Sequence, residues 1–251
     1  MTSSTWKRVV VAMMTAIVLM AGGSAAQAQT ADGSKWSVDF GIGWDNGLSG
    51  QVNSSGYGTL NNQVVVILNN TYSDVYGTGL HLRFGGGYML NDNTEVKGTF
   101  TFQSLDADFI VPMGDYGSSN LYGQYTDYQT FGLDVGLRRY GRITDKLQGY
   151  GEGLIGIGFV DKIDVTLIAP GAGLAGKAND FYDQTAAFAF AINVGMLVQT
   201  SQKLGWFGQL GVRFQTGLDE IDGLVATGLD NINDKSSRWS LPIVGGIRYR
   251  F

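Results

Sequence analysis

The chain has no cysteine, one histidine and three prolines among its 251 residues. The absence of cysteine excludes disulfides, thiolate metal sites and a lipid anchor on an N-terminal cysteine. The single histidine, His81, argues against a transition-metal site. Beyond residue 28 there is also no apolar run near the ~20 residues that a membrane-spanning helix needs. The chain must therefore be stabilised by burial or by lipid, and it can cross a membrane only as strands.

The first 28 residues have the pattern of a cleaved signal peptide. Lys7 and Arg8 form a basic region, the apolar run "VVVAMMTAIVLMA" covers 9–21, and Ala26-Gln27-Ala28 matches the A-x-A cleavage pattern. We therefore expect export and one mature domain over 29–251. That domain keeps 15 basic residues against 22 acidic ones, which argues against nucleic acid as a partner.

The composition favours strands over helices. The chain has 38 glycines and 12% aromatic residues, and it is poor in the mixture of alanine, leucine, glutamate and lysine that is typical of helices. Alternation of apolar and polar residues predicts eight strands. Their expected ranges are 36–46, 75–90, 94–104, 128–140, 147–160, 185–199, 205–216 and 238–251.

The connections between these segments alternate in length. Three are short ("LNDN", "GRITDK" and "TSQKL"), and the other four run to about twenty residues or more. This pattern predicts a transmembrane antiparallel up-and-down β-barrel of eight strands with short periplasmic turns and four long extracellular loops. A periplasmic β-sandwich or lipocalin-like barrel is one alternative. A second is a ten-stranded barrel in which "VVVIL" at 64–68 and "VTLIA" at 165–169 are additional strands.

Each predicted strand has an apolar face and a polar face. Residues such as Phe40 and Ile155 fall on the face expected to meet lipid, whereas charged residues fall on the other face, with Arg139 as the exception. Aromatic residues near both strand ends predict two interfacial girdles. Trp36, Tyr88, Trp206 and Tyr249 form the girdle near the short turns, and Trp44, Tyr76 and Trp239 form the one near the long loops.

The chain ends in "IVGGIRYRF", with apolar residues at alternate positions. Tyr249 and Phe251 resemble the C-terminal signal that the barrel-assembly machinery reads in outer-membrane proteins. The mature chain as a whole resembles the small eight-stranded family of Gram-negative bacteria that includes the OmpA transmembrane domain, OmpX and opacity-type porin-like proteins. The resemblance implies a location in the outer membrane and contact with outer-membrane lipid and lipopolysaccharide. These features are specific for the class but say little about activity; we expect a structural or surface-interaction role without enzymatic activity or cofactor.

The lumen of an eight-stranded barrel is barely wide enough for side chains, so charges inside it must pair. We expect an ion-paired plug, similar to the salt-bridge cluster of OmpA-type barrels, made by Asp39, Arg83, Lys97, Asp134, Glu152, Arg213 and Arg248. The alternative is a narrow conducting channel, because Gly156, Gly158 and Ala187 leave space towards the long loops. A lipid-modifying enzyme comes third, since His81 has the wrong parity for a catalytic site on the outer wall.

Apolar runs interrupt the long loops, with Val65, Ile67, Phe109, Ile110 and Leu167 as their central residues. They predict either a packed cap over the lumen or an apolar pocket, as in OmpW-like barrels that take up small hydrophobic molecules. A weaker run lies at 224–226. Acidic clusters in the loops favour an anionic surface, with bound Ca²⁺ or Mg²⁺ as the alternative, and "DNIND" at 230–234 only faintly resembles a calcium loop. The match of 151–156 to G-x-G-x-x-G has no following helix, which argues against a dinucleotide site.

Overall fold

The computed structural model describes residues 35–221, 229, 232–233 and 236–251. The expected signal peptide and the segments at 224–226 and 230–234 fall wholly or largely outside these ranges. Residues 35–250 form one compact unit. No helix within the described residues is long and apolar enough to cross a membrane.

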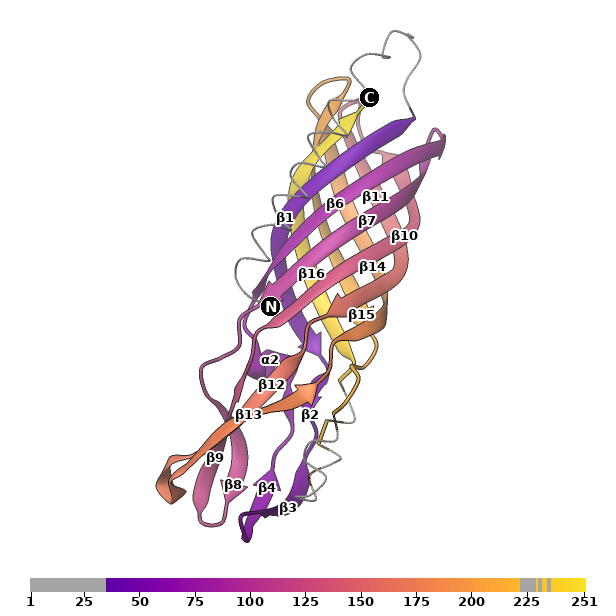
Figure 1. Cartoon of the computed structure of the whole chain (residues 1–251). Helices are drawn as coiled ribbons and strands as arrows, with labels where there is room; N and C mark the ends of the chain where they lie inside the picture. Colours follow the sequence, from indigo (N-terminus) through magenta and orange to yellow (C-terminus); the bar gives the residue numbers. More distant parts are fainter. Residues whose placement is uncertain (1–34, 222–228, 230–231, 234–235) are drawn as a thin grey trace. The chain divides into compact units, whose positions relative to one another are not determined.

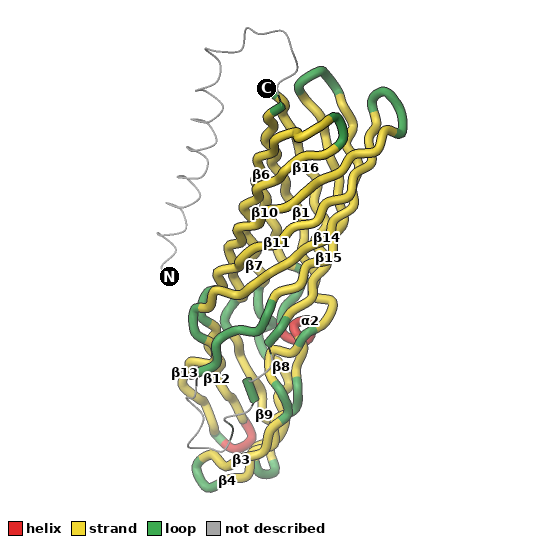
Figure 2. The backbone as a smooth tube through the Cα atoms, turned by 90° about the vertical axis from the view of Figure 1, so that its right-hand side faces the viewer, coloured by secondary structure: helices red, strands yellow, loops and turns green. Residues whose placement is uncertain are grey.

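Eight antiparallel strands close into a barrel in the order β1-β16-β15-β14-β11-β10-β7-β6 (Figures 1 and 2). The strands are β1 (Trp36–Ser49), β6 (Gly79–Asn91), β7 (Thr94–Leu105), β10 (Tyr128–Arg142), β11 (Leu147–Val160), β14 (Thr185–Gln199), β15 (Leu204–Gln215) and β16 (Arg238–Arg250). The prediction of an eight-stranded up-and-down barrel is therefore confirmed. The last strand pairs with the first from Arg250 opposite Ser37, so neither presents a free edge.

The stagger of the strands can be followed through their register. From Ile42, paired residues lead to Ala186 on β14 in one direction round the barrel and to Met196 on the same strand in the other. The two endpoints are ten residues apart. Such a stagger tilts the strands by roughly 35–45° and leaves an interior that side chains fill.

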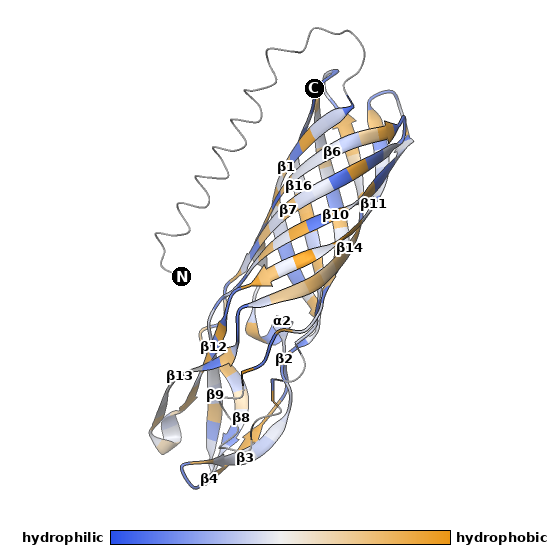
Figure 3. Cartoon of the chain, turned by 45° about the vertical axis from the view of Figure 1, so that its right-hand side comes forward, coloured by the Kyte–Doolittle hydropathy of each residue, from blue (hydrophilic) through white to orange (hydrophobic). Residues whose placement is uncertain are grey.

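The two rims of the barrel differ as the sequence predicts. The short-turn rim holds the three tight connections, at 92–93, 143–146 and 200–203, whereas the long-loop rim holds the connections at 50–78, 106–127, 161–184 and 216–237. Apolar residues alternate with polar ones along the barrel strands (Figure 3). Outward residues such as Ile42, Leu133 and Ile192 are exposed, as expected for a wall that faces lipid.

The long loops build a second sheet instead of additional barrel strands. It has six strands in the order β13-β12-β9-β8-β4-β3, and β2 and β5 pair separately. The ten-stranded alternative is therefore wrong, because the two apolar runs behind it lie in β4 and β12. The bounds of these strands are β2 (Gln51–Asn53), β3 (Gly56–Leu60), β4 (Gln63–Ile67), β5 (Asn70–Thr71), β8 (Val111–Tyr116), β9 (Ser119–Tyr125), β12 (Ile163–Ala169) and β13 (Leu174–Tyr182).

The predicted strand at 75–90 begins later, at Gly79, because a short helix precedes it. This helix is α2 (Tyr72–Val75), and Thr71 donates its backbone N–H to the Asp74 carboxylate over 2.8 Å. Tyr72, Val75 and Tyr76 have helical spacing and are buried in the loop core. The prediction that Tyr76 belongs to an aromatic girdle is consequently wrong.

Candidate functional site

A network of charged and polar side chains lies in the half of the lumen nearest the short-turn rim. Every barrel strand contributes at least one member, and all of them are buried. The members are Asp39 (β1), Arg83 (β6), Glu95 and Lys97 (β7), Arg138 (β10), Glu152 (β11), Asn193 (β14), Gln209 (β15) and Arg248 (β16). We call this set the lumen network.

Arg138 is the central member of the lumen network. Its Nε donates to Glu152 Oε2 over 2.9 Å and its Nη1 to Asp39 Oδ2 over 3.1 Å. Its guanidinium also lies 4.3 Å from the centre of the Tyr150 ring. Arg138 thus joins two carboxylates on different strands and stacks on an aromatic face, an arrangement that suits the planar, always charged guanidinium.

Two further cations complete the pairing of these carboxylates. Arg83 Nη2 lies 2.7 Å from Glu152 Oε1, and Lys97 Nζ lies 2.6 Å from Asp39 Oδ2. Gln209 accepts a hydrogen bond from Arg83 over 2.9 Å. A continuous chain of alternating charge therefore crosses the lumen from β6 to β7.

Glu95 and Arg248 close the network towards the short-turn rim. Their two nearest atoms, Arg248 Nη2 and Glu95 Oε1, are 2.6 Å apart, and a second bond joins Nη1 to Oε2 over 2.9 Å. Ser37 and Tyr140 donate their hydroxyls to the same carboxylate, over 2.6 and 2.7 Å. This bidentate geometry fixes both side chains in place.

Two separate ion pairs lie farther towards the long-loop rim. Arg213 binds Asp134 through both terminal nitrogens, over 2.9 and 3.1 Å, and Arg238 Nη2 lies 2.6 Å from Asp45 Oδ2. The buried charges of the lumen are five acids and six bases, so they nearly balance. Charges buried at this depth are tolerated only when they are paired and hydrogen-bonded.

Tyrosines cover the lumen where it opens towards the loops. The ring centres of Tyr72, Tyr76 and Tyr128 lie 5.7 to 6.0 Å apart. The Arg238 guanidinium lies 4.9 Å from the Tyr128 ring and 5.7 Å from the Tyr72 ring. Burial among other tyrosines raises the pKa of Tyr72 and of Tyr76 well above the usual range. We call these three tyrosines the tyrosine cover.

All seven residues expected to plug the lumen lie inside it and form ion pairs. They form two groups, since Asp134 and Arg213 pair only with each other. Arg138 and Glu95, although on the predicted inner face, are absent from those seven. Tyr140 and Tyr150 were not predicted, although Tyr140 shares the parity of Arg138 on β10 and Tyr150 that of Glu152 on β11. Sequence alternation identifies the inner face but not which of its charges meet.

The five apolar loop residues divide between two environments. Val65, Ile67 and Leu167 are buried in one core with the tyrosine cover, whereas Phe109 and Ile110 are exposed. The three buried side chains are packed as a cap, which is one of the two arrangements that the apolar runs predict. No group of three acidic or histidine residues suited to a metal ion occurs in the described part of the chain.

The structure also bears on the remaining candidates for chemistry. His81 is buried in the lumen, with its Nδ1 3.1 Å from Gln103 Nε2, so it cannot serve a catalytic site on the outer wall. The G-x-G-x-x-G segment lies in the middle of β11 and no helix follows it. Tyr249 is partly exposed on the outer wall near the short-turn rim, in keeping with the girdle predicted there.

Comparison with known proteins gives similarity in fold alone. No family model and no curated protein matches the chain. Among solved structures, Neisserial surface protein A has 9% identity and a TM-score of 0.46, covering 88% of this chain and 99% of its own. The outer-membrane protease OmpT of Escherichia coli has 9% identity and a TM-score of 0.46, covering 89% of this chain and 99% of its own. A major outer-membrane protein of Thermus thermophilus has 15% identity and a TM-score of 0.45, covering 85% of this chain and 99% of its own. No binding property or activity follows from likeness at this level.

Proposed function

We propose that this protein is a non-enzymatic outer-membrane barrel with a closed lumen, which acts in envelope structure or surface interaction. The observation that carries the proposal is the lumen network, in which all eight strands contribute charged or polar side chains to one hydrogen-bonded set. Ions could pass only if these pairs separated, and each exposed charge would then be left without a partner. The ion pairs Asp134–Arg213 and Asp45–Arg238 and the tyrosine cover lie along the same path, between the lumen network and the long loops.

The proposed location follows from the outer wall and the chain's ends. An apolar exterior is stable only in lipid, and the predicted signal peptide would direct the chain out of the cytoplasm. We propose contacts with outer-membrane lipid and lipopolysaccharide along this wall. Tyr249 and Phe251 are the proposed assembly signal for the barrel-assembly machinery, and removing both aromatic side chains should slow membrane insertion.

The other two functions receive less support. A channel for small hydrophobic molecules needs an apolar path, but Val65, Ile67 and Leu167 are packed together and the lumen beneath them is charged. An enzyme acting on lipids would need its catalytic groups on the outer wall, and His81 is not there. The six-stranded loop sheet remains the proposed surface for an external partner.

Planar-bilayer conductance of the refolded protein tests the closed lumen. The wild type should pass no steady current, and neither should Arg142→Ala, a control at an exposed position on the short-turn rim. The double variant Arg83→Ala/Glu152→Ala removes two members of the lumen network and should pass more current than the wild type. If the double variant passes no current, adding Asp45→Ala/Arg238→Ala tests whether the ion pair nearer the long-loop rim keeps the lumen closed. A steady wild-type current would contradict the proposal and favour transport.

A further inference from the structure

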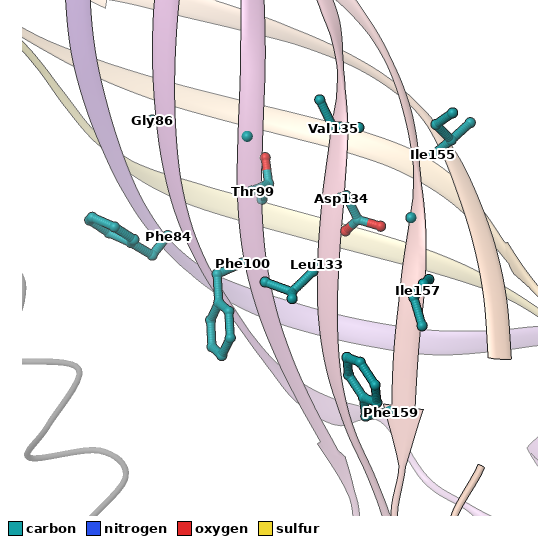
Figure 4. A pocket seen from close by; sticks show the side chains of 12 residues that line it. Phe84, Gly86, Thr99, Phe100, Leu133, Asp134, Val135, Ile155, Ile157 and Phe159 are labelled. Atoms are coloured by element: carbon teal, nitrogen blue, oxygen red, sulfur yellow. The ribbon is translucent and has the colours of Figure 1, made fainter. Parts of the chain in front are cut away.

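The lipid-facing wall carries a groove across four neighbouring strands, β6, β7, β10 and β11 (Figure 4). Its volume is about 570 Å³. Gly86 and Gly98 pair across β6 and β7 within it, and a Cβ on either would meet no atom within 4 Å. The larger side chains that line the groove are Phe84, Phe100, Leu133, Ile155, Ile157 and Phe159. We call this the wall groove.

Along β10, the outward face continues from the wall groove towards the short-turn rim. After Leu133 and Val135 come Leu137 and then Arg139, at every second position. Bare glycines flank this line, with Gly98 opposite Val135 on β7 and Gly153 opposite Leu137 on β11. A Cβ at Gly153 would also meet nothing within 4 Å. The row of β10 side chains therefore has open space on both sides.

Arg139 ends this row as an exposed, outward-pointing cation. It lies opposite Thr94, the first residue of β7 after a two-residue turn, and opposite Gly151 on β11. Within the described chain its side chain has no hydrogen bond or ion pair, in contrast to the six paired bases of the lumen. Tyr88, the girdle residue of β6, is two pairing steps from Leu137, through Val96, and Arg139 lies two positions beyond Leu137 towards the rim. The guanidinium is therefore at headgroup level, where a lipid phosphate is the available anion.

The length of the row matches one leaflet of a bilayer. Arg139 lies six positions after Leu133, which at about 3.3 Å per residue is about 20 Å along the strand. At the tilt of such a barrel this corresponds to about 15 Å of depth, half of a hydrocarbon core about 30 Å thick. An acyl chain of a lipid whose headgroup lies at Arg139 therefore reaches the middle of the membrane at the wall groove.

From these observations we infer that Arg139 and the wall groove bind one anionic phospholipid in the leaflet at the short-turn rim. The phosphate diester accepts hydrogen bonds from the guanidinium. One acyl chain lies beside β10, over the bare glycines, and ends among the aromatic side chains of the groove. Because this site does not involve the lumen, a negative result for lipid binding would leave the proposal of a closed lumen unaffected.

Native mass spectrometry of the full barrel, released from detergent with added dioleoyl phosphatidylglycerol, tests the site. The variants are Arg139→Gln, which removes the cation, and Gly98→Leu, which fills the open space. Matched controls are Lys203→Gln, in another turn of the same rim, and Gly208→Leu, on β15, where a Cβ also meets nothing within 4 Å. Heat-modifiable gel migration verifies that each variant is folded.

The wild type should retain one phosphatidylglycerol. Each of the two site variants should bind it about tenfold more weakly, the size expected for one charge-assisted hydrogen bond or for lost chain packing. The two controls should bind as the wild type does. Equal binding by all variants would overturn the inference. So would displacement of the lipid by inorganic phosphate, which would reveal a simple anion site, or a Gly98-dependent dimer without bound lipid, which would assign the groove to a second copy.

Discussion

Arg138 and Arg142 show how position within one strand decides what an arginine does. Both belong to β10, but Arg138 is 1% exposed and holds Asp39 and Glu152, whereas Arg142 ends the strand at the rim and pairs with Asp145 in the exposed turn. Buried pairs leave an uncompensated charge when one partner is removed, whereas exposed pairs contribute little. The same residue type therefore has a very different weight at the two positions.

This contrast gives a quantitative prediction. Arg138→Ala should lower the free energy of unfolding by about 3–5 kcal/mol, because two buried carboxylates lose a partner. Arg142→Ala should change it by less than about 1 kcal/mol. Urea unfolding in lipid vesicles, followed by tryptophan fluorescence, measures both. Similar values for the two variants would mean that the lumen network is solvated and weak.

At the scale of elements, the loop cap depends on alternation within β4. Val65 is 0% exposed in the loop core, and its neighbour Val64 is 45% exposed. Val65→Asp would bury an unpaired carboxylate and should unfold the cap, so that the loops become sensitive to protease. Val64→Asp is the matched control and should leave the loops resistant. Heat-modifiable migration should persist in both, because the barrel has its own strand pairing; loss of it in Val65→Asp alone would show that the cap and barrel fold as one unit.

The tyrosine cover gives the cap a dependence on pH. Burial raises the pKa of Tyr72 and Tyr76 above 10.0 in the folded state, so their neutral forms are favoured there. Their contribution to stability is fully present below pH 10 and is lost as pH rises above it, when the tyrosines of the unfolded cap ionise. The slope is about 1.4 kcal/mol per pH unit for each tyrosine.

Protease sensitivity of the loops between pH 9 and pH 11, at about one-unit steps, measures this effect. In Tyr72→Phe the slope should be smaller, because one ionising group is gone, even though the hydrogen bond from its hydroxyl to the Ser236 carbonyl is lost as well. An unchanged slope in that variant would show that Tyr72 ionises as easily in the folded cap as in the unfolded one.

At the scale of the whole molecule, the apolar wall implies a depth-dependent cost for charge. Leu210 lies in the middle of β15 and Leu204 at its start, and both face outward. Leu210→Arg should lower the free energy of unfolding in lipid vesicles by about 2–4 kcal/mol, and Leu204→Arg by about 0–1 kcal/mol. Equal costs at the two depths would be incompatible with a wall that spans the bilayer.

The sequence alone determined the barrel and the two faces of its strands. A strand has a side-chain period of two, and closure in lipid demands one apolar face, so alternation along residues such as Phe40 and Asp39 is a local signal. The short and long connections followed from the same segments. That is why eight strands and seven lumen charges could be predicted without a structure.

Only the tertiary structure decided which charges meet and what the loops build. Arg138 donates a hydrogen bond to Asp39, which is 99 positions away in the sequence. The ten-residue stagger brings these two side chains to the same depth in the barrel, and no local pattern in the sequence encodes that stagger. The apolar run at 64–68 predicts a strand whether that strand belongs to the barrel or to the loop sheet. Its place in the loop sheet rather than in the barrel depends on partners such as β8, which are distant in the sequence. Long-range register is a property of the closed fold, whereas the face of each residue is a property of its strand.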